Sequence, residues 1–257
     1  MTIDLNADLG ESFGPWRMGA DEALLDIITS ANVACGFHAG DPVVMDRTVK
    51  LASANGVAVG AHPGFRDLEG FGRRRVQGLD ADDVRTLVRY QLGALQAIAR
   101  SHGTSVGHVK LHGALGNMAS EDEALARTFV EAVRAGDPGL VVVTMASTAL
   151  ERAAGELGHP HVREIYADRA YNDDGTLVGR GQPGAMIDDA DEAADRVLAM
   201  LEDGAVTALS GRKIEVVPET VCVHGDGPDA VAMARTIRRR LETAGVRVAP
   251  FVQQEAR

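Results

Sequence analysis

This chain has few aromatic residues, few cysteines and no excess of basic charge. Aromatic residues make up 4% of its 257 residues, and the formal net charge is −11. Nucleic acid binding needs a basic field for phosphates and rings for stacking bases, so these two shortages argue against it. Cys35 and Cys222 both lie in apolar runs, and we expect them to be reduced packing residues in a reducing compartment, without a disulfide.

The sequence also lacks the segments that direct a protein to a membrane. No apolar stretch approaches the roughly 20 residues needed to cross a bilayer. The first residues do not combine a basic stretch with an apolar core, as a secretory signal would. We therefore expect a cytoplasmic protein that does not act on a membrane.

The sequence does contain a repeated pattern, in which short apolar strands end in polar or ionisable residues. The segment 3–8 alternates apolar residues with Asp4, Asn6 and Asp8, and then opens into a glycine loop that carries Glu11. A single segment of this kind is typical of an edge strand with one face exposed to solvent. Four later segments repeat the pattern and end at His38, at His62, at Lys110 with His112, and at His224 with Asp226.

Strand-like and helix-like segments alternate along nearly the whole chain. We expect strands at 3–8, 31–35, 57–61, 106–111, 140–145, 162–166, 220–224 and 246–249, and helices at 21–29, 43–55, 81–102, 121–135, 147–157, 189–203 and 228–244, with a hairpin within 205–217. This alternation predicts an α/β fold with a parallel sheet and helical crossovers. Seven or eight such units in 257 residues favour a closed or nearly closed (β/α) barrel, and we expect 1–257 to form a single domain.

The polar strand ends predict one shared site, because loops at the carboxyl ends of parallel strands surround a common crevice. Asp8, His38 and His62 have the atoms to bind a divalent metal ion. Metal-free acid–base chemistry, in which a carboxylate orients a histidine, is the alternative, and the sequence leaves both open. Lys110 beside His112 adds a cation that could hold a substrate carboxylate or stabilise an oxyanion. These five residues are our catalytic candidates.

Two loops have residues that could bind a substrate. The segment 60–75 combines glycines with four arginines, among which Arg73 and Arg74 could cradle an anion, although a solvated basic loop is equally consistent. The segment 164–171 leads Asp168 and Arg169 into a long loop, 167–188, that could close over a substrate. The further candidates for substrate binding are Asn6, Glu11, His224 and Asp226. The sequence has no Gly-x-x-x-x-Gly-Lys-Ser/Thr motif, so it has no P-loop for a nucleotide.

Six motifs closely resemble the LamB/YcsF family, the family of the 5-oxoprolinase A subunit. They are DLNADLGESFG at 4–14, SANVACGFHAGDP at 30–42, GAHPG at 60–64, FGRR at 71–74, ADRAY at 167–171 and CVHGD at 222–226. The resemblance runs from residue 3 to about residue 245. One run departs from the family pattern, because Leu111 and Gly116 stand where the family usually has Pro and Tyr.

The resemblance implies a distorted TIM-like barrel of the glycoside hydrolase/deacetylase kind. It also implies a hydrolase subunit of an ATP-dependent 5-oxoprolinase, which opens 5-oxo-L-proline (pyroglutamate) to L-glutamate with two partner subunits and with ATP as co-substrate. It leaves open whether a divalent metal is bound and whether the chain forms a homo-oligomer. Two other classes remain open: a stand-alone metal-dependent deacetylase or amidohydrolase acting on a sugar or cyclic amide, and a non-catalytic subunit of a carboxylase-like assembly.

Overall fold

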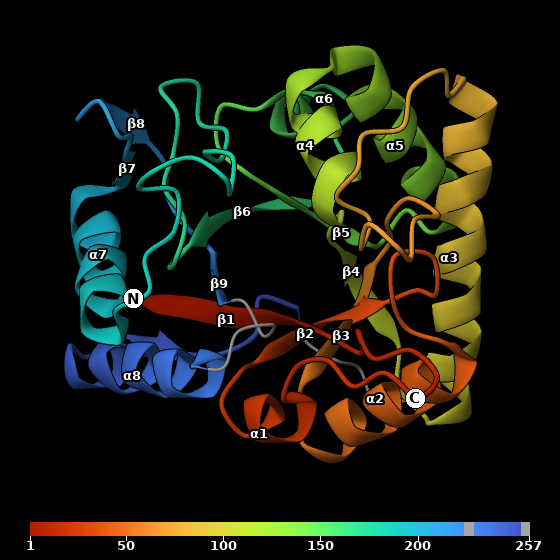
Figure 1. The fold of residues 1–257 in the computed structure, drawn as a ribbon, viewed down its shortest axis with the longest axis horizontal. Coiled ribbons are helices and arrows are strands. Elements are labelled where there is room, and N and C mark those ends of the chain that lie inside the picture. Colours follow the sequence, from red (N-terminus) through yellow and green to blue (C-terminus); the bar gives the residue numbers. More distant parts are fainter. Residues whose placement is uncertain (224–228, 253–257) are drawn as a thin grey trace.

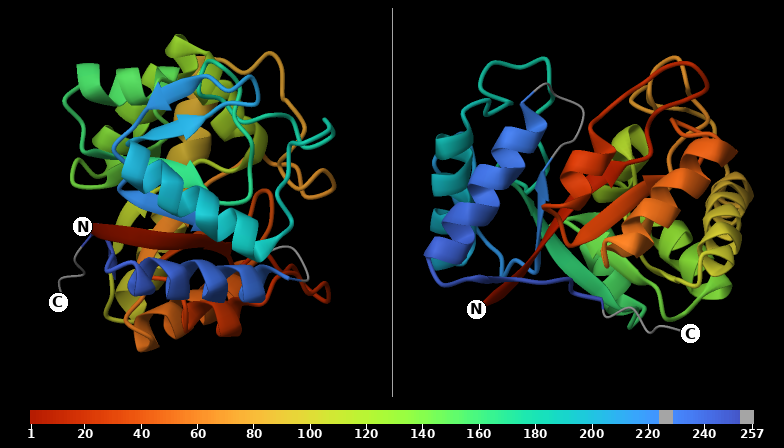
Figure 2. Two further views of the ribbon diagram at one scale, coloured as in Figure 1. Left: turned by 90° about the vertical axis from the view of Figure 1, so that its left-hand side faces the viewer. Right: turned by 90° about the horizontal axis from the view of Figure 1, so that it is seen from below.

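A closed parallel barrel forms the centre of the molecule (Figures 1 and 2). The computed structural model describes residues 1–223 and 229–252. Within these residues, seven parallel strands pair in the order β1 (Thr2–Leu9), β2 (Ser30–Ala34), β3 (Ala58–His62), β4 (Val106–Val109), β5 (Val141–Thr144), β6 (His161–Tyr166) and β9 (Thr220–Val223), and β9 returns to β1. The predicted α/β barrel is therefore confirmed.

Helices cover the outside of the barrel, as the crossover rule for parallel strands requires. The longer ones are α2 (Pro42–Ala54), α3 (Ala81–Ser101), α5 (Glu123–Gly136), α7 (Ala190–Asp203) and α8 (Ala230–Thr243); α1 (Asp21–Leu25), α4 (Gly113–Glu121) and α6 (Ala149–Glu156) are shorter. Two predicted starts have the expected caps. The Asp41 side chain accepts from the Val43 and Val44 amides, and Asp80 forms a capping box with Asp83. Among the described residues, no helix is both long and apolar enough to span a bilayer.

The sequence prediction differs from the structure after β4. The helix expected at 121–135 is present as α5, which Asp122 caps by accepting from the Ala124 and Leu125 amides, but α4 precedes it and was not predicted. The start of α4 was hidden because glycines are poor helix formers. Gly113 is needed there for another reason: its φ is +54°, and a Cβ atom on it would lie 2.7 Å from the Gly72 carbonyl oxygen.

The hairpin expected within 205–217 is also present. β7 (Ala205–Thr207) and β8 (Lys213–Glu215) pair in antiparallel register outside the barrel, near the end of α7 (Figure 1). The remaining short strand, β10 (Arg247–Val248), extends the sheet by pairing in parallel with the start of β1. Phe251 then packs edge-on against His108, and a Cβ atom on Gly107 would lie 2.6 Å from the Val252 side chain. The last described residues therefore pack against the start of β4.

Both faces of the barrel strands are buried, but the face turned into the barrel carries polar side chains. We call Asp4, Asn6, Ser30, Asn32, His108 and Thr220 the lower polar layer. The Asp4 carboxylate accepts hydrogen bonds from the hydroxyls of Thr29, Ser30 and Thr220. Burial nevertheless raises the pKa of Asp4 to about 6, because the charged form loses its hydration.

The amides of the lower polar layer connect it to the residues above. The Asn6 amide donates to Thr220 and to Glu164, and its oxygen accepts from the Asn32 amide at 2.7 Å. The Asn32 amide also donates to Asp8 at 2.9 Å, and its oxygen lies 2.9 Å from His108 Nε2. Burial lowers the pKa of His108 to about 3, so the ring is neutral and donates through Nε2. The layer thus fixes the orientation of Asp8 from below.

Candidate active site

A cavity of about 270 Å³ lies at the carboxyl ends of the barrel strands. Each of several strands delivers side chains to it at or just beyond its end. They are Asp8 from β1, His62 from β3, Lys110 and His112 after β4, Thr144 from β5, and Glu164 and Tyr166 from β6. The cavity therefore occupies the place where parallel barrels gather their functional groups.

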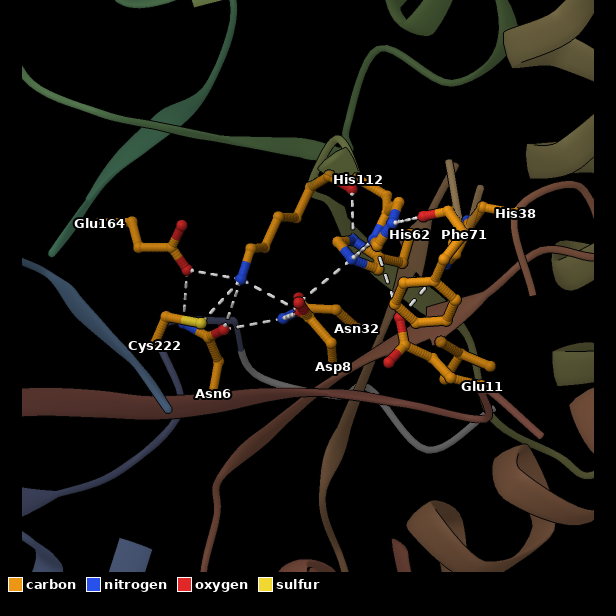
Figure 3. A network of polar contacts seen from close by, with 12 residues as sticks. Asn6, Asp8, Glu11, Asn32, His38, His62, Phe71, His112, Glu164 and Cys222 are labelled. Carbon is orange, nitrogen blue, oxygen red and sulfur yellow. Dashed lines mark hydrogen bonds and ion pairs between the residues drawn. The ribbon is translucent and has the colours of Figure 1, made fainter. Parts of the chain in front are cut away.

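Lys110 is a buried ammonium that contacts several polar side chains, and Figure 3 labels three of its partners, Asp8, Glu164 and Cys222. Its Nζ lies 3.1 Å from Asp8 Oδ1, 3.0 Å from Glu164 Oε1 and 3.0 Å from Cys222 Sγ. Burial opposes the charge, but Asp8 and Glu164 offset it and raise the pKa of Lys110 well above its usual value. The requirement that a buried lysine has a carboxylate partner is thus met twice.

Cys35 and Cys222 are both free and buried, as expected from the sequence. Cys222 does more than fill space, because its sulfur contacts the Lys110 ammonium. Burial raises the pKa of the Cys222 thiol well above its usual value, so the group is a neutral thiol beside Lys110.

Two histidines face each other with their lone pairs. His62 Nδ1 lies 2.8 Å from the Lys110 carbonyl oxygen, so Nδ1 carries the proton and Nε2 carries the lone pair. His112 Nε2 donates in the same way to the Phe71 carbonyl oxygen at 2.7 Å, which leaves the lone pair on Nδ1. These two lone-pair nitrogens are 3.0 Å apart, and Asp8 Oδ2 lies 3.2 Å from His62 Nε2. Two lone pairs at this distance repel, and either a proton or a metal ion between the two nitrogens removes this repulsion.

A third histidine and a carboxylate complete what we call the imidazole cluster: Glu11, His38, His62 and His112 (Figure 3). The His38 ring stacks on His112 with 3.6 Å between centroids, and its Nε2 lies 3.3 Å from Glu11 Oε1. One ligand atom from each residue lies within 4.8 Å of the others. This cluster of Glu and His residues can hold a metal ion.

The protonation states in the imidazole cluster suit metal binding. Burial, followed by the neighbouring imidazoles, lowers the pKa of His38 well below its usual value. The same causes lower the pKa of His112 to about 3. Both rings are therefore neutral at pH 7, which is the form that coordinates metals.

Two glycines allow the imidazoles to pack this closely. A Cβ atom on Gly64 would lie 2.7 Å from His38 Nδ1. A Cβ atom on Gly72 would lie 2.6 Å from His38 Cβ and 2.8 Å from His112 Cδ2, and Gly72 also has a φ of +63°. The glycines in the loop after β3 therefore serve close approach to the cluster rather than flexibility.

The structure brings most of the predicted site residues to the cavity or directly beside it. Asp8, Glu11, His62, Lys110 and His112 line the cavity, and His38 stacks behind His112. Of the residues expected to bind substrate, Arg73 and Arg169 line the cavity as well. Asn6 lies below it, where it contacts Lys110 at 3.3 Å and Glu164 at 3.0 Å.

Besides His38 and Asn6, two more of the expected residues do not line the cavity, and two cannot be placed. The exposed Arg74 guanidinium forms ion pairs with Asp67 and Glu69 instead, because these carboxylates lie in the same loop. Asp168 is buried but is not part of the cavity wall. His224 and Asp226 lie outside the described residues.

The segment 10–14 has the Gly-x-Ser-x-Gly order of a hydrolase nucleophile elbow, but it is not one in the structure. An elbow presents its serine between a strand and a helix. Ser12 Oγ instead exchanges hydrogen bonds with the backbone of Met18, at 3.0 and 3.2 Å, and it does not line the cavity. The segment therefore contributes Glu11 to the site, and Ser12 only shapes the loop.

Sequence reasoning missed several residues that matter to the geometry. Glu164 begins the segment 164–171 but was not among the site candidates, yet it pairs with Lys110. Arg180 lines the cavity from the long loop 167–188. The period-two spacing of Glu164 and Tyr166 was the available signal for the first, while Arg180 has no local signal.

Comparison with known proteins agrees with this architecture. Residues 3–256 match the model of the LamB/YcsF family. The chain belongs to this family. It is 56% identical over 251 residues to the 5-oxoprolinase A subunit from Rhodopseudomonas palustris, covering 98% of this chain and 99% of that protein. Among solved structures, the "Lactam Utilization Protein" from Thermus thermophilus superimposes with a TM-score of 0.92 at 46% identity, covering 98% of this chain and 100% of that chain.

A more distant neighbour shares the fold of this LamB/YcsF member. A polysaccharide deacetylase from Bacillus cereus matches with a TM-score of 0.53 at 16% identity, covering 98% of this chain and 92% of that chain. The deacetylase-like character expected of the barrel is therefore confirmed at the level of fold.

Proposed function

We propose that this chain is the A subunit of an ATP-dependent 5-oxoprolinase, a hydrolase that opens the cyclic amide of 5-oxo-L-proline to give L-glutamate. The observation that carries the proposal is the 56% identity, over 98% of the chain, to a protein named as that subunit of 5-oxoprolinase. The cavity supports it, because about 270 Å³ suits a small ring rather than a polymer. ATP would be used together with two partner subunits, and we assign nucleotide binding to those subunits.

We further propose that Glu11, His38, His62 and His112 hold a divalent metal ion. The donor set fits, because neutral imidazoles and a carboxylate are the ligands of catalytic zinc and similar ions. The facing lone pairs of His62 and His112 fit as well, since a cation between them removes their repulsion. Such an ion, when bound, would polarise a carbonyl group or lower the pKa of a water molecule.

The chain's own residues would position the substrate and move protons. Asp8, oriented by Asn32 and Lys110 through Oδ1, leaves Oδ2 beside His62, so this carboxylate can accept a proton from an attacking water. The Lys110 ammonium would stabilise the negative charge that develops on the amide oxygen. Because Asp8 and Glu164 keep Lys110 charged, this stabilisation is present before the reaction starts.

Glutamate release from 5-oxoproline tests the proposal directly. The chain should be assayed alone and with both partner subunits, each with and without ATP. We expect release only from the complete mixture with ATP. ATP-dependent release by the purified chain alone would overturn the assignment of nucleotide binding to the partners, and no release from the complete mixture would overturn the function.

A stand-alone metal-dependent amidohydrolase is the second candidate, which the imidazole cluster favours because it can hold its ion without partners. Hydrolysis of a cyclic amide or an acetylated sugar by the metal-loaded chain without ATP would support it.

A further inference from the structure

Arg169 is an unusual arginine, because it is buried with an unused donor. Its exposed fraction is 6%, and it lines the cavity. One terminal nitrogen, Nη2, donates to the Val178 carbonyl oxygen at 2.6 Å, but Nε has no hydrogen-bond partner within the described residues. A buried guanidinium that leaves a donor unpaired loses hydration without full compensation.

The backbone holds Arg169 in place from two sides. Arg169 forms a bridge with Met186 on the returning part of the loop 167–188, and Arg196 of α7 donates to the Arg169 carbonyl oxygen at 3.2 Å. The guanidinium is therefore presented by a fixed segment. An arginine that is rigidly placed and incompletely bonded is prepared for a ligand.

The cavity is lined by charges of both signs. Asp8, Lys110 and Glu164 belong to barrel strands or directly follow them, whereas Arg73, Arg169 and Arg180 come from loops. Burial, and then the charge of Arg180, lower the pKa of Arg169, and Asp168 acts in the opposite direction but less strongly. The Arg180 side chain has one polar contact within residues 1–223 and 229–252, at 3.7 Å to the weak acceptor Met186 Sδ.

We propose that Arg169, with Arg180 and Arg73, forms an oxyanion-binding subsite that holds an anionic group of the substrate while its ring faces Lys110 and the imidazole cluster. A guanidinium offers parallel donors that match the oxygens of a carboxylate or a phosphoryl group. The subsite would thus select a lactam that carries a negative charge over a neutral one. The identity of the ring rests on the proposed function, but the anion subsite does not.

Two groups could supply this anion: the ring carboxylate of 5-oxoproline, or a phosphoryl group placed on the lactam by ATP. Isothermal titration calorimetry of the full chain with 5-oxoproline, neutral 2-pyrrolidinone and inorganic phosphate separates them. A preference for 5-oxoproline over 2-pyrrolidinone that disappears in Arg169→Gln supports the carboxylate. Equal binding of the two lactams, with phosphate binding that depends on Arg169, supports the phosphoryl group.

We expect Arg169→Gln to weaken binding of the relevant anion by about 10- to 100-fold, the change that follows from losing a charge-assisted hydrogen bond. Arg127→Gln is the control, because Arg127 pairs with Glu156 on the surface and does not line the cavity. It should bind as the unmodified chain does. Melting curves establish that the variants are folded, and Arg180→Gln replaces Arg169→Gln if the latter unfolds.

The subsite is overturned if folded variants of Arg169 and Arg180 bind both anions as the unmodified chain does, or if the unmodified chain binds neither anion. This outcome differs from failure of the proposed function. Phosphate binding that depends on Arg169, together with no glutamate release from the complete mixture, would retain the subsite and reject the 5-oxoprolinase assignment.

Discussion

The lower polar layer and the imidazole cluster lie in the same barrel, yet their hydrogen-bonding groups are arranged in opposite ways. In the lower polar layer, donors face acceptors: the hydroxyls of Ser30, Thr220 and the neighbouring Thr29 donate to Asp4, and the Asn32 amide donates to the Asn6 oxygen. In the imidazole cluster, lone pairs face each other at 3.0 Å. Polar groups whose donors face acceptors stabilise one conformation by themselves. Groups whose lone pairs face each other are stable only when a proton or a metal ion binds between them. The comparison indicates that the lower layer is scaffold and that the cluster is prepared for a ligand.

Lys110 joins the two regions, so its replacement should have the largest effect. Lys110→Met leaves the buried Glu164 and the partly buried Asp8 without their shared cation, and we expect a loss of about 3–5 kcal/mol in the free energy of unfolding. ATP-dependent glutamate release by the reconstituted complex should fall by about 10²–10³-fold, since the oxyanion loses its preformed charge. Urea unfolding and steady-state kinetics measure the two effects separately.

The double variant Lys110→Met with Glu164→Gln is the matched control for this experiment. It removes one of the two carboxylates, so it should recover part of the stability and none of the activity. Recovery of activity together with stability would show that Lys110 is only a structural cation.

Replacing the histidines of the imidazole cluster should remove metal while leaving the scaffold folded. Purified chain should contain about one divalent ion, and His62→Gln or His112→Gln should lower this content to near zero. His102→Gln is the control, because His102 pairs with Asp46 at the end of α3, away from the cluster. Elemental analysis by mass spectrometry gives the number of metal ions per chain. Metal retained by both cluster variants would contradict the proposed ligand set.

The lower polar layer should reveal itself in the pH dependence of stability. The pKa of Asp4 is raised from 3.8 to about 6, so the folded state holds a proton that the unfolded state has released. The stability that Asp4 contributes is therefore complete below pH 3.8 and is lost as the pH rises through 6, by about 3 kcal/mol in total. Urea unfolding of the unmodified chain and of Asp4→Asn between about pH 4 and 7 measures it across the window that these pKa values define. Parallel stability curves for the two would refute it.

Two glycines give the smallest and most local test. A Cβ atom on Gly60 would overlap the His108 ring, whereas nothing lies within 4 Å of a Cβ atom on Gly93 in α3. We expect Gly60→Ala to cost about 1–3 kcal/mol of stability through overpacking. Gly93→Ala should add about 0.5–1 kcal/mol, because alanine favours a helix. Equal effects in thermal unfolding would argue against the packing of His108 under β3.

The barrel and the polar residues at its strand ends could be predicted from the sequence, because both depend on patterns among residues close together in the chain. Period-two spacing and helix caps place residues on a face or at an end without reference to distant parts of the chain. The partners of Lys110 are different, since Glu164 and Cys222 are brought to it by the closure and register of the sheet. Spacing could place Asp8, His38 and His62 at one crevice, but it could not say that Glu11 and His112 would complete a four-residue cluster.

The loop residues were the hardest to place for a related reason. Arg74 and Arg73 are neighbours in the sequence, yet Arg74 turns to Asp67 and Glu69 while Arg73 lines the cavity. Loops lack a fixed period, so nothing in the spacing separates two adjacent arginines. Only the folded path of the segment does.

The pairing of β1 with β9 has a consequence for how the chain is made. Asn6 and Cys222 are register partners, so this edge of β1 is covered only after the whole segment between these two residues has been synthesised. At ordinary rates of translation this interval lasts roughly 10–40 s. During that time β1 offers an open edge, which is where unwanted pairing with other chains begins. The barrel interior, and with it the environment of Lys110, is completed only when β9 has been synthesised.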